Sequence, residues 1–263
     1  MAGDLDSFAH FARSLAAAAR RETLPGWRES WEGAENKLEQ GFDPVTQSDR
    51  NSEMAIRRLI EAEYPEHGIA GEEFADRPAA GRWSWSIDPI DGTRAYICGL
   101  PSWTTLIALL DGGEPVLGIV DVPRLDELYL GHGGEARVFA AAGEARALAT
   151  SGCRGLAEAR LSTTDPYLFG GAEAEGFERL RRSARLTRYG LDAYGYALVA
   201  AGSLDIVAES GLKPHDYNAL VPLVRAAGGA VSNWSGGSDI SAGRIVAAAS
   251  EALLEEACRL LAG

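Results

Sequence analysis

Closely spaced strand patterns in the first half of the chain constrain its fold more than any other feature. Along residues 82–88, the apolar side chains Trp83, Trp85 and Ile87 alternate with polar ones. A period of two is typical of a half-buried β-strand. Further strand candidates follow at 103–110, 115–122, 127–131 and 136–140. Their spacing predicts an antiparallel sheet.

The pattern changes after about residue 140 to alternating helices and strands. The predicted helices are 172–183, 192–201, 216–227 and 250–261, and the predicted strands are 185–189, 204–209, 229–234 and 245–249. We therefore predict an N-terminal α+β part over residues 1–140 and a C-terminal α/β part over residues 141–263. No Ser-, Gly- or Pro-rich stretch separates them, so we expect the two parts to pack together.

Two helices and a short strand precede the predicted sheet. Apolar residues recur at helical spacing along residues 4–21. A second helix is predicted to begin at a Thr46 or Ser48 cap and to run to about Glu63. The short strand 69–71 follows it and leads directly into two acidic residues.

The net charge of the chain limits its partners. The 263 residues include 25 Lys and Arg and 38 Asp and Glu, which gives a net charge of −13 at neutral pH. Nucleic-acid binding needs basic surface against the phosphate backbone, so we expect no nucleic-acid partner. A small anionic substrate remains compatible with this charge if a local positive group, such as a metal ion, accompanies it.

Targeting and redox features are few. The longest apolar run, about Leu106 to Leu110, is far shorter than the roughly 20 residues that span a bilayer, so we expect no membrane association. The N-terminal segment has acidic residues and no basic n-region, which indicates a helix rather than a signal peptide. The three widely spaced cysteines include no CxxC pair and fit a reducing cytosol, so we expect a cytoplasmic protein.

The hexapeptide DPIDGT at 88–93 is the densest cluster of chemically active residues. The preceding strand is predicted to end on Asp88, because Pro89 lacks the N–H that a central ladder needs. Gly92 permits a tight turn, and Thr93 can begin a helix. In that geometry the two aspartates converge near helix-start N–H groups, which places a cation site beside an anion site. Taken alone, such a hexapeptide is more often a turn with solvated acids.

Acids elsewhere in the chain strengthen the metal interpretation. Glu72 and Glu73 follow the short strand 69–71. Asp49 falls at a predicted helix start, where an acid also favours the helix dipole. Asp216 begins the predicted helix 216–227, where it could equally be an ordinary N-cap. Strand-end and helix-start acids from both parts would meet in a crevice between the parts, where α/β folds bind ligands.

These elements, in this order, resemble the inositol monophosphatase superfamily of metal-dependent, lithium-sensitive phosphatases. The family pattern is an acid, a Glu-Glu pair, D-P-I/L-D-G/S-T/S, and then W-D followed after eleven residues by G-G. The corresponding residues here are Asp49, Glu72-Glu73, the hexapeptide 88–93, His215-Asp216 and Gly228-Gly229. The resemblance covers about residues 5–260. It implies a layered α-β-α-β-α sandwich, of the inositol monophosphatase and fructose-1,6-bisphosphatase type, that forms a homodimer.

The resemblance also implies roles for individual residues. It implies two or three Mg²⁺ ions in each site, with ligands from Glu72, Asp88, Asp91, Asp216 and the carbonyl of Ile90. It implies that Asp49 and Thr93 pair to position or activate the attacking water together with Glu72. The N–H groups of Gly92 and Thr93 would hold the phosphate, and Glu209 would contact the polar group of a small phosphorylated substrate. His215 stands where many members have Trp, and we expect it to shape the substrate wall rather than bind metal.

Further details are similar to the histidinol-phosphate phosphatases of this superfamily. They are Arg94, the run 99–109, and the segments 163–166, 188–194 and 211–214. Asp192 and Glu209 could bind the ammonium or imidazole of L-histidinol phosphate, and Arg94 is a further substrate-binding candidate. Asp192 could instead cap the helix that follows it, and Arg94 could be a solvated helix residue. Ala193 stands where these phosphatases often have Cys, and His215 where they usually have Tyr.

Three functions are compatible with these residues. The first is Mg²⁺-dependent hydrolysis of L-histidinol phosphate to L-histidinol and phosphate, as in histidine biosynthesis. The second is hydrolysis of inositol 1-phosphate or of a range of sugar and nucleotide phosphomonoesters. The third is a non-catalytic binding protein, which the complete acid set disfavours because an unused cluster of carboxylates is repulsive.

Overall fold

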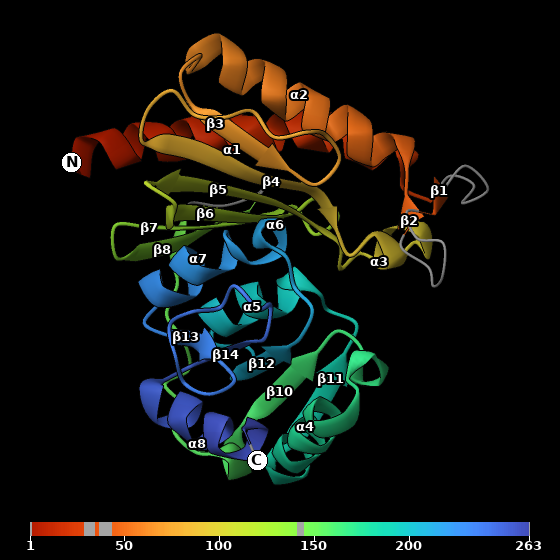
Figure 1. Ribbon diagram of the computed structural model, residues 1–263, viewed down its shortest axis with the longest axis vertical. Helices are drawn as coiled ribbons and strands as arrows, with labels where there is room; N and C mark the ends of the chain where they lie inside the picture. The colour runs from red at the N-terminus through yellow and green to blue at the C-terminus, as the bar shows by residue number, and fades with distance from the viewer. Residues whose placement is uncertain (1, 29–34, 37–43, 141–144, 263) are drawn as a thin grey trace.

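The computed structural model describes residues 2–28, 35–36, 44–140 and 145–262. These residues form five stacked layers: two helices, a seven-stranded sheet, a central helical layer, a five-stranded sheet and an outer pair of helices (Figure 1). The layers are those of the α-β-α-β-α sandwich that the resemblance implied. That expectation is therefore confirmed.

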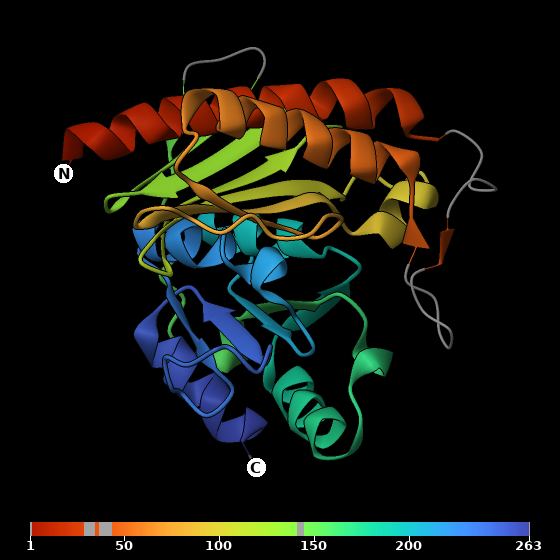
Figure 2. The same cartoon turned by 45° about the horizontal axis from the view of Figure 1, so that its top comes forward.

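The first layer consists of α1 (Ala2–Gly26) and α2 (Gln47–Glu63), which lie side by side on the larger sheet (Figures 1 and 2). Leu15 of α1 and Ile56 of α2 are buried in one apolar cluster with Trp85 and Ile107 of the sheet. Both helices were predicted from their apolar spacing. Helix α1 continues beyond the predicted end at residue 21, with Pro25 in its final turn.

The larger sheet follows chain order. Its strands are β3 (Gly68–Gly71), β4 (Trp83–Asp91), β5 (Thr104–Asp111), β6 (Glu114–Val122), β7 (Glu127–His132), β8 (Glu135–Ala140) and β9 (Arg146–Ala147). The pair β3–β4 is parallel, and every later neighbouring pair is antiparallel. The predicted antiparallel sheet is confirmed.

The central layer packs on the other face of this sheet and contains α5 (Ala193–Ala200), α6 (Pro214–Tyr217) and α7 (Leu220–Ala226). Ile107 faces α1 and α2, whereas its neighbour Leu106 faces the central helices, as the two-residue period of a strand requires. A Cβ atom at Gly118 would lie 1.9 Å from the carbonyl oxygen of Ala219, so glycine lets the helical layer approach the sheet.

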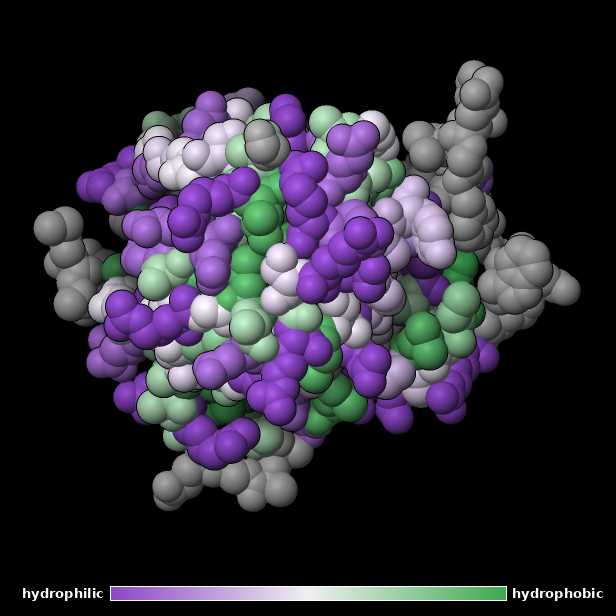
Figure 3. Space-filling model, turned by 90° about the horizontal axis from the view of Figure 1, so that it is seen from below, coloured by the Kyte–Doolittle hydropathy of each residue, from purple (hydrophilic) through white to green (hydrophobic). Residues whose placement is uncertain are grey.

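The smaller sheet has the strand order β11 (Leu186–Tyr189), β10 (Arg160–Thr163), β12 (Ile206–Glu209), β14 (Ile245–Ala248) and β13 (Ala230–Asn233). Helices α4 (Gly171–Ser183) and α8 (Glu251–Leu261) cover its outer face. The end of the molecule seen in Figure 3 carries many hydrophilic side chains, with apolar ones showing between them. This outer layer therefore meets solvent with polar groups and buries its apolar ones against the sheet.

The structure corrects the sequence prediction in the second half of the chain. Strand β10 was not predicted, because Leu161 is its one strongly apolar residue and its buried polar residues are satisfied by tertiary hydrogen bonds. The predicted single helix 216–227 is two helices, α6 and α7. The predicted boundary between residues 140 and 141 adjoins residues 141–144, which lie outside the described residues. Beyond them β9 still pairs with β8.

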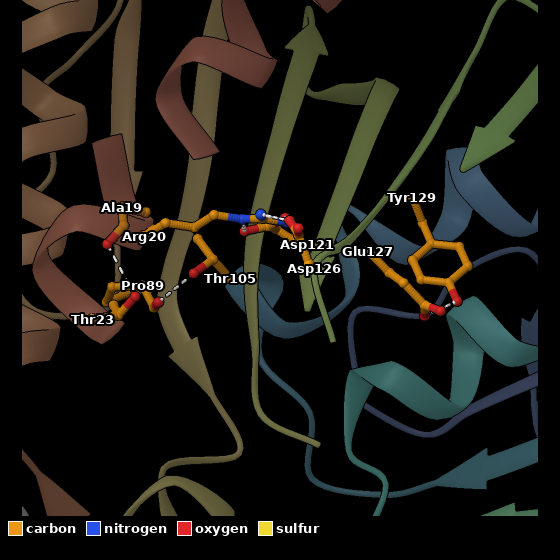
Figure 4. Close-up of polar contacts among 9 residues, drawn as sticks. All are labelled: Ala19, Arg20, Thr23, Pro89, Thr105, Asp121, Asp126, Glu127 and Tyr129. Carbon is orange, nitrogen blue, oxygen red and sulfur yellow. Dashed lines mark hydrogen bonds and ion pairs between the residues drawn. The ribbon is translucent and has the colours of Figure 1, made fainter. Parts of the chain in front are cut away.

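A buried ion pair fastens α1 to the larger sheet. The Arg20 guanidinium donates to both carboxylate oxygens of Asp121 on β6, at 2.8 and 2.7 Å, and also bonds Asp126 (Figure 4). Burial raises the pKa of Asp121 to about 6, although Arg20 acts against that rise.

Within the part of the chain that the structure describes, no helix is long and apolar enough to cross a membrane.

Candidate active site

A cavity of about 310 Å³ opens where the ends of β4 and β12 meet the beginnings of α3 (Thr93–Ile97), α5 and α6. Its lining includes the predicted residues Glu72, Asp88, Ile90, Asp91, Gly92, Thr93, Arg94, Asp192, Glu209 and Asp216. Residues from both halves of the sequence thus share one cavity.

An irregularity in β4 turns the two aspartates of the hexapeptide toward this cavity. The strand does not end on Asp88, as predicted, but continues to Asp91 across a register shift. Pro89 lies within the shift, where its missing N–H interrupts no regular ladder bond. Its carbonyl accepts a hydrogen bond from the buried Thr105 hydroxyl at 2.8 Å (Figure 4). Gly92 follows with φ of 78°, in the left-handed region, so the tight turn that this glycine permits is formed.

Two overlapping groups of metal-ligating side chains line the cavity. Ligand atoms of Asp88, Asp91 and Asp216 lie within 4.8 Å of one another, and so do those of Asp88, Glu72 and His215. Asp88 belongs to both groups. Carboxylate oxygens are the ligands that Mg²⁺ prefers, so this donor set fits a hard divalent cation. His215 Nε2 also lies 3.4 Å from Asp216 Oδ1, which gives the imidazole a partner other than a metal.

The electrostatics of the cluster also fit a cation. Burial raises the pKa of Asp88 well above its ordinary value, and the nearby charges of Glu72 and Asp91 raise it further. Burial likewise raises the pKa of Asp91, with Asp192 and Asp216 adding repulsion. These acids repel one another when ionised, and a divalent cation would remove that repulsion.

Asp49 lies outside the cavity lining and occupies the first turn of α2, fully buried. Its Oδ2 accepts bonds from the backbone N–H and the hydroxyl of Thr46, the N-cap, at 2.8 and 2.5 Å. Its Oδ1 is buried without a hydrogen-bond partner among the described residues. The Thr93 hydroxyl donates instead to the Ile90 carbonyl at 3.0 Å. The pairing of Asp49 with Thr93 therefore stays a prediction.

Asp216 resembles Asp49 in its local setting. It is the third residue of α6, and its Oδ2 accepts the backbone N–H of Lys213 at 2.7 Å. The N-cap of α6 is Lys213, so the alternative of Asp216 as the N-cap is wrong, although Asp216 supports the cap from the N3 position. The residue also lines the cavity. Both helix-start acids are held in place by the backbone of the turn that precedes them.

The loop before α5 sets Asp192 against the hexapeptide. Asp192 adopts φ of 48° and makes no side-chain cap bond, so the capping alternative for this residue is wrong. The N–H of Ala193 donates to Asp91 Oδ2 at 2.8 Å instead. A Cβ atom at Gly92 would lie 3.1 Å from the Asp192 carboxylate carbon, so the two loops touch. Burial raises the pKa of Asp192 to about 6, against the attraction of the exposed Arg94.

Glu209 ends β12 and is held by the neighbouring strand β10. Its Oε1 accepts the backbone N–H and the hydroxyl of Thr164 at 2.7 and 2.9 Å, and its Oε2 accepts the Thr163 hydroxyl at 3.2 Å. Burial raises its pKa to about 7, and the charge of Asp192 contributes to that rise. The supporting role of Thr163 and Thr164 was not predicted from chemistry, because strand β10 itself was missed.

Lys213 and Tyr196 are among the cavity residues that were assigned no role from the sequence. Lys213 lines the cavity and brings a positive charge to it. Tyr196 lines it too, but its hydroxyl is buried without a partner among the described residues. Tyr196 lies on an apolar stretch of α5, so its position beside the acids was not visible from residue type.

We expect the metal-free protein to lose stability as the pH rises from about 5 to about 8. In the folded state burial raises the pKa of Asp49 to about 7, of Glu209 to about 7 and of Asp192 to about 6. These acids ionise near pH 4 in the unfolded chain, so the folded state holds protons that the unfolded state has released. The stability that these acids contribute is complete below about pH 4. It is lost as the pH rises through the pKa values of the folded state.

Thermal unfolding in EDTA across this pH range measures the effect. The midpoint temperature should fall with rising pH in EDTA, and added Mg²⁺ should restore it at the alkaline end. A midpoint that is constant or rises with pH in EDTA would contradict the assignment of these buried acids.

Comparisons with known proteins agree with the geometry. A family model described as the inositol monophosphatase family matches residues 4–262. The chloroplastic bifunctional phosphatase IMPL2 of Arabidopsis thaliana is 38% identical over 235 residues, covering 89% of this chain and 66% of that protein, just under two thirds of its length. A histidinol-phosphatase of Chlorobaculum parvum is 35% identical over 211 residues, covering 80% of each. A solved structure of an inositol monophosphatase from Zymomonas mobilis is 37% identical, covers 98% of each chain and superposes with a TM-score of 0.85.

Proposed function

The chain belongs to the inositol monophosphatase family of metal-dependent phosphatases, and we propose that it hydrolyses L-histidinol phosphate to L-histidinol and phosphate with Mg²⁺. One observation carries the choice of substrate. Asp192 and Glu209 both place carboxyl groups on the cavity wall, and the charge of Asp192 contributes to the raised pKa of Glu209. Histidinol phosphate presents an ammonium group beyond its phosphate, and such a pair would bind it. Inositol presents hydroxyl groups there.

The metal centre is proposed to consist of Glu72, Asp88, Asp91 and Asp216, with the Ile90 carbonyl. Bound Mg²⁺ would offset the phosphate charge and make a water molecule more acidic. The protein's own contribution is to hold both reactants in line. The backbone N–H groups of Gly92 and Thr93 would hold the phosphate oxygens, since both residues line the cavity at the start of α3.

Proton transfer is assigned to Glu72 in the cavity lining, together with Asp49, which lies outside that lining. Water forms a bond to phosphorus while the ester P–O bond breaks. Glu72 would take one proton from the water, which Asp49 and Thr93 would help to position, and that proton can pass to the departing alcohol oxygen. The raised pKa of Asp49, about 7, matches a group that exchanges a proton near neutral pH.

Hydrolysis of inositol 1-phosphate is the second candidate, because the Zymomonas mobilis structure similar to this chain is named as an inositol monophosphatase. Hydrolysis of a broad set of sugar and nucleotide phosphomonoesters would use the same metal centre. The metal acids do not distinguish these substrates. The wall lined by Asp192, Glu209 and His215 would distinguish them.

The experiment is a side-by-side measurement of phosphate release from L-histidinol phosphate and myo-inositol 1-phosphate, each with Mg²⁺ and with EDTA. We expect a higher kcat/KM for histidinol phosphate and no release in EDTA. A preference for inositol phosphate, or equal slow release from both, would overturn the substrate assignment and keep the metal centre. No release from either ester or from a wider panel would favour a non-catalytic binding protein.

The oligomeric state and the number of metal ions are proposed from the resemblance, and the location from the sequence features described above. We propose a homodimer in the cytoplasm with two or three Mg²⁺ ions in each site. Light scattering on the purified protein tests the homodimer, and calorimetric titration with Mg²⁺ tests the number of ions. Cell fractionation tests the location. A monomer, or a single ion in each site, would contradict the corresponding proposal.

A further inference from the structure

A buried acid and a partly buried arginine on α2 lie outside the proposed reaction. Glu53 and Arg57 follow Asp49 at intervals of four residues, so the three side chains share one helix face. The Glu53 side chain is fully buried and that of Arg57 is 12% exposed. Arg57 Nε donates to Glu53 Oε1 at 2.7 Å. A charged pair at this depth needs a reason, because apolar side chains of similar size often stabilise a protein as well or better.

Both side chains reach the loop that carries Glu72. Glu53 Oε2 accepts the backbone N–H of Glu73 at 2.7 Å. The two terminal nitrogens of Arg57 donate to the carbonyls of Phe74 and Ala75, at 3.1 and 3.2 Å. The pair thus bonds three consecutive backbone groups immediately after Glu72.

The start of the loop is fitted to the same carboxylate. A Cβ atom at Gly71 would lie 2.0 Å from Glu53 Oε1, so the carboxylate packs directly against the glycine backbone. Glu53 therefore contacts the chain on both sides of Glu72, at residues 71 and 73. The position of Glu72 between these contacts follows from the position of Glu53 on a long, straight helix (Figure 2).

We propose that Glu53 and Arg57 are positioning residues that hold the loop 71–75 on α2 and thereby set Glu72 at the metal centre. The same helix carries Asp49 in its first turn, so one rigid element fixes both acids relative to each other. The inference rests on the proposed metal role of Glu72. It does not depend on which phosphate ester is the substrate.

The test is the affinity for Mg²⁺ in the absence of substrate, measured by calorimetric titration and by the shift of the thermal midpoint. Glu53→Gln keeps the size of the side chain but removes the charge that holds Arg57. Arg57→Lys keeps the charge but cannot reach both carbonyls. Each variant should bind Mg²⁺ about tenfold more weakly or worse, as happens when residues that orient metal ligands are changed.

A kinetic readout separates positioning from general destabilisation. We expect the Mg²⁺ concentration for half-maximal phosphate release to rise in both variants, with KM for the ester at saturating Mg²⁺ within twofold of the original value. Because Arg57→Lys is the milder change, it covers the case in which Glu53→Gln fails to fold.

Asp205→Asn is the matched control. Asp205 is also a buried acid held by an arginine, since Arg160 Nε donates to it at 2.7 Å. It precedes β12, at the opposite end of that strand from Glu209. This variant should lose stability yet keep its Mg²⁺ affinity. The proposal fails if folded Glu53→Gln and Arg57→Lys proteins bind Mg²⁺ like the original, if Asp205→Asn weakens binding as much, or if the unaltered protein binds no Mg²⁺.

Discussion

Replacing Asp88 with Asn should abolish phosphate release while leaving the fold intact. Asp88 is 2% exposed and belongs to both ligand groups, so it is placed to bridge two cations. Loss of a bridging carboxylate removes several kcal/mol of charge stabilisation, which corresponds to a rate loss of about a thousandfold or more. Phosphate release at saturating Mg²⁺, together with circular dichroism of the variant, measures the effect.

The same substitution should stabilise the protein when metal is absent. Asp88 is crowded by Glu72, Asp91 and Asp216, and burial with like charge raises its pKa. A neutral amide of the same shape removes that repulsion, so the thermal midpoint in EDTA at mildly alkaline pH should rise. The rise in thermal midpoint on adding Mg²⁺ should be smaller in this variant than in the unaltered protein.

Asp121→Asn is a useful contrast, because Asp121 is an equally buried acid that serves α1 rather than the cavity. Its replacement leaves Arg20 without its main partner and should lower stability while phosphate release continues. Near-normal turnover in folded Asp88→Asn protein would refute the bridging role.

Replacing Asp192 with Asn should reduce kcat/KM for L-histidinol phosphate far more than for inositol 1-phosphate. A hydrogen bond to a charged group contributes about 1.5–3 kcal/mol, so the loss for the ammonium substrate should be about tenfold to a hundredfold. The inositol ester has no cation to meet this carboxylate, so its kcat/KM should change less than threefold. The assay should run near pH 8, because the pKa of Asp192 is raised to about 6 and the carboxylate must be ionised.

Asp165→Asn provides the charge-matched comparison. Asp165 follows Thr164, and its Oδ1 accepts the backbone N–H of Tyr167 at 2.9 Å. Asp165 is not among the residues that line the cavity. Its replacement should leave kcat/KM for both esters within twofold of the original values. Equal losses for the two esters in Asp192→Asn would show that Asp192 supports the loop rather than selects the substrate.

Much of the site could be predicted because its chemistry is local. The spacing within residues 88–93 required a strand, a break and a helix start, and the structure contains all three. The left-handed turn at Gly92 follows from the same six residues. Likewise, the cap at Thr46 and the helix after it follow from short-range hydrogen bonding. Patterns of this kind act over a few residues, so one sequence suffices to recognise them.

Other features were predicted wrongly or missed because they depend on distant partners. The ladder of β4 continues past Asp88 because β5 pairs beyond the break, and the Thr105 hydroxyl holds the Pro89 carbonyl there. Strand β10 exists because β11 and β12 flank it on both sides. Neither result is encoded in the hydropathy of the segment itself.

The sequence by itself determined the strand and helix periods, the order of the acidic motifs and the strongly negative charge. Tertiary structure alone decided which of those acids lie together. Asp91, for example, accepts the backbone N–H of Ala193, a residue far along the chain. It also decided that Asp192 stands at the start of α5 with φ of 48° and no side-chain cap bond. In the same way, it decided that Glu53 and Arg57 contact the loop after Glu72. The physical reason is range: periodicity and turns follow from neighbouring residues, whereas distances between side chains follow from how whole layers pack.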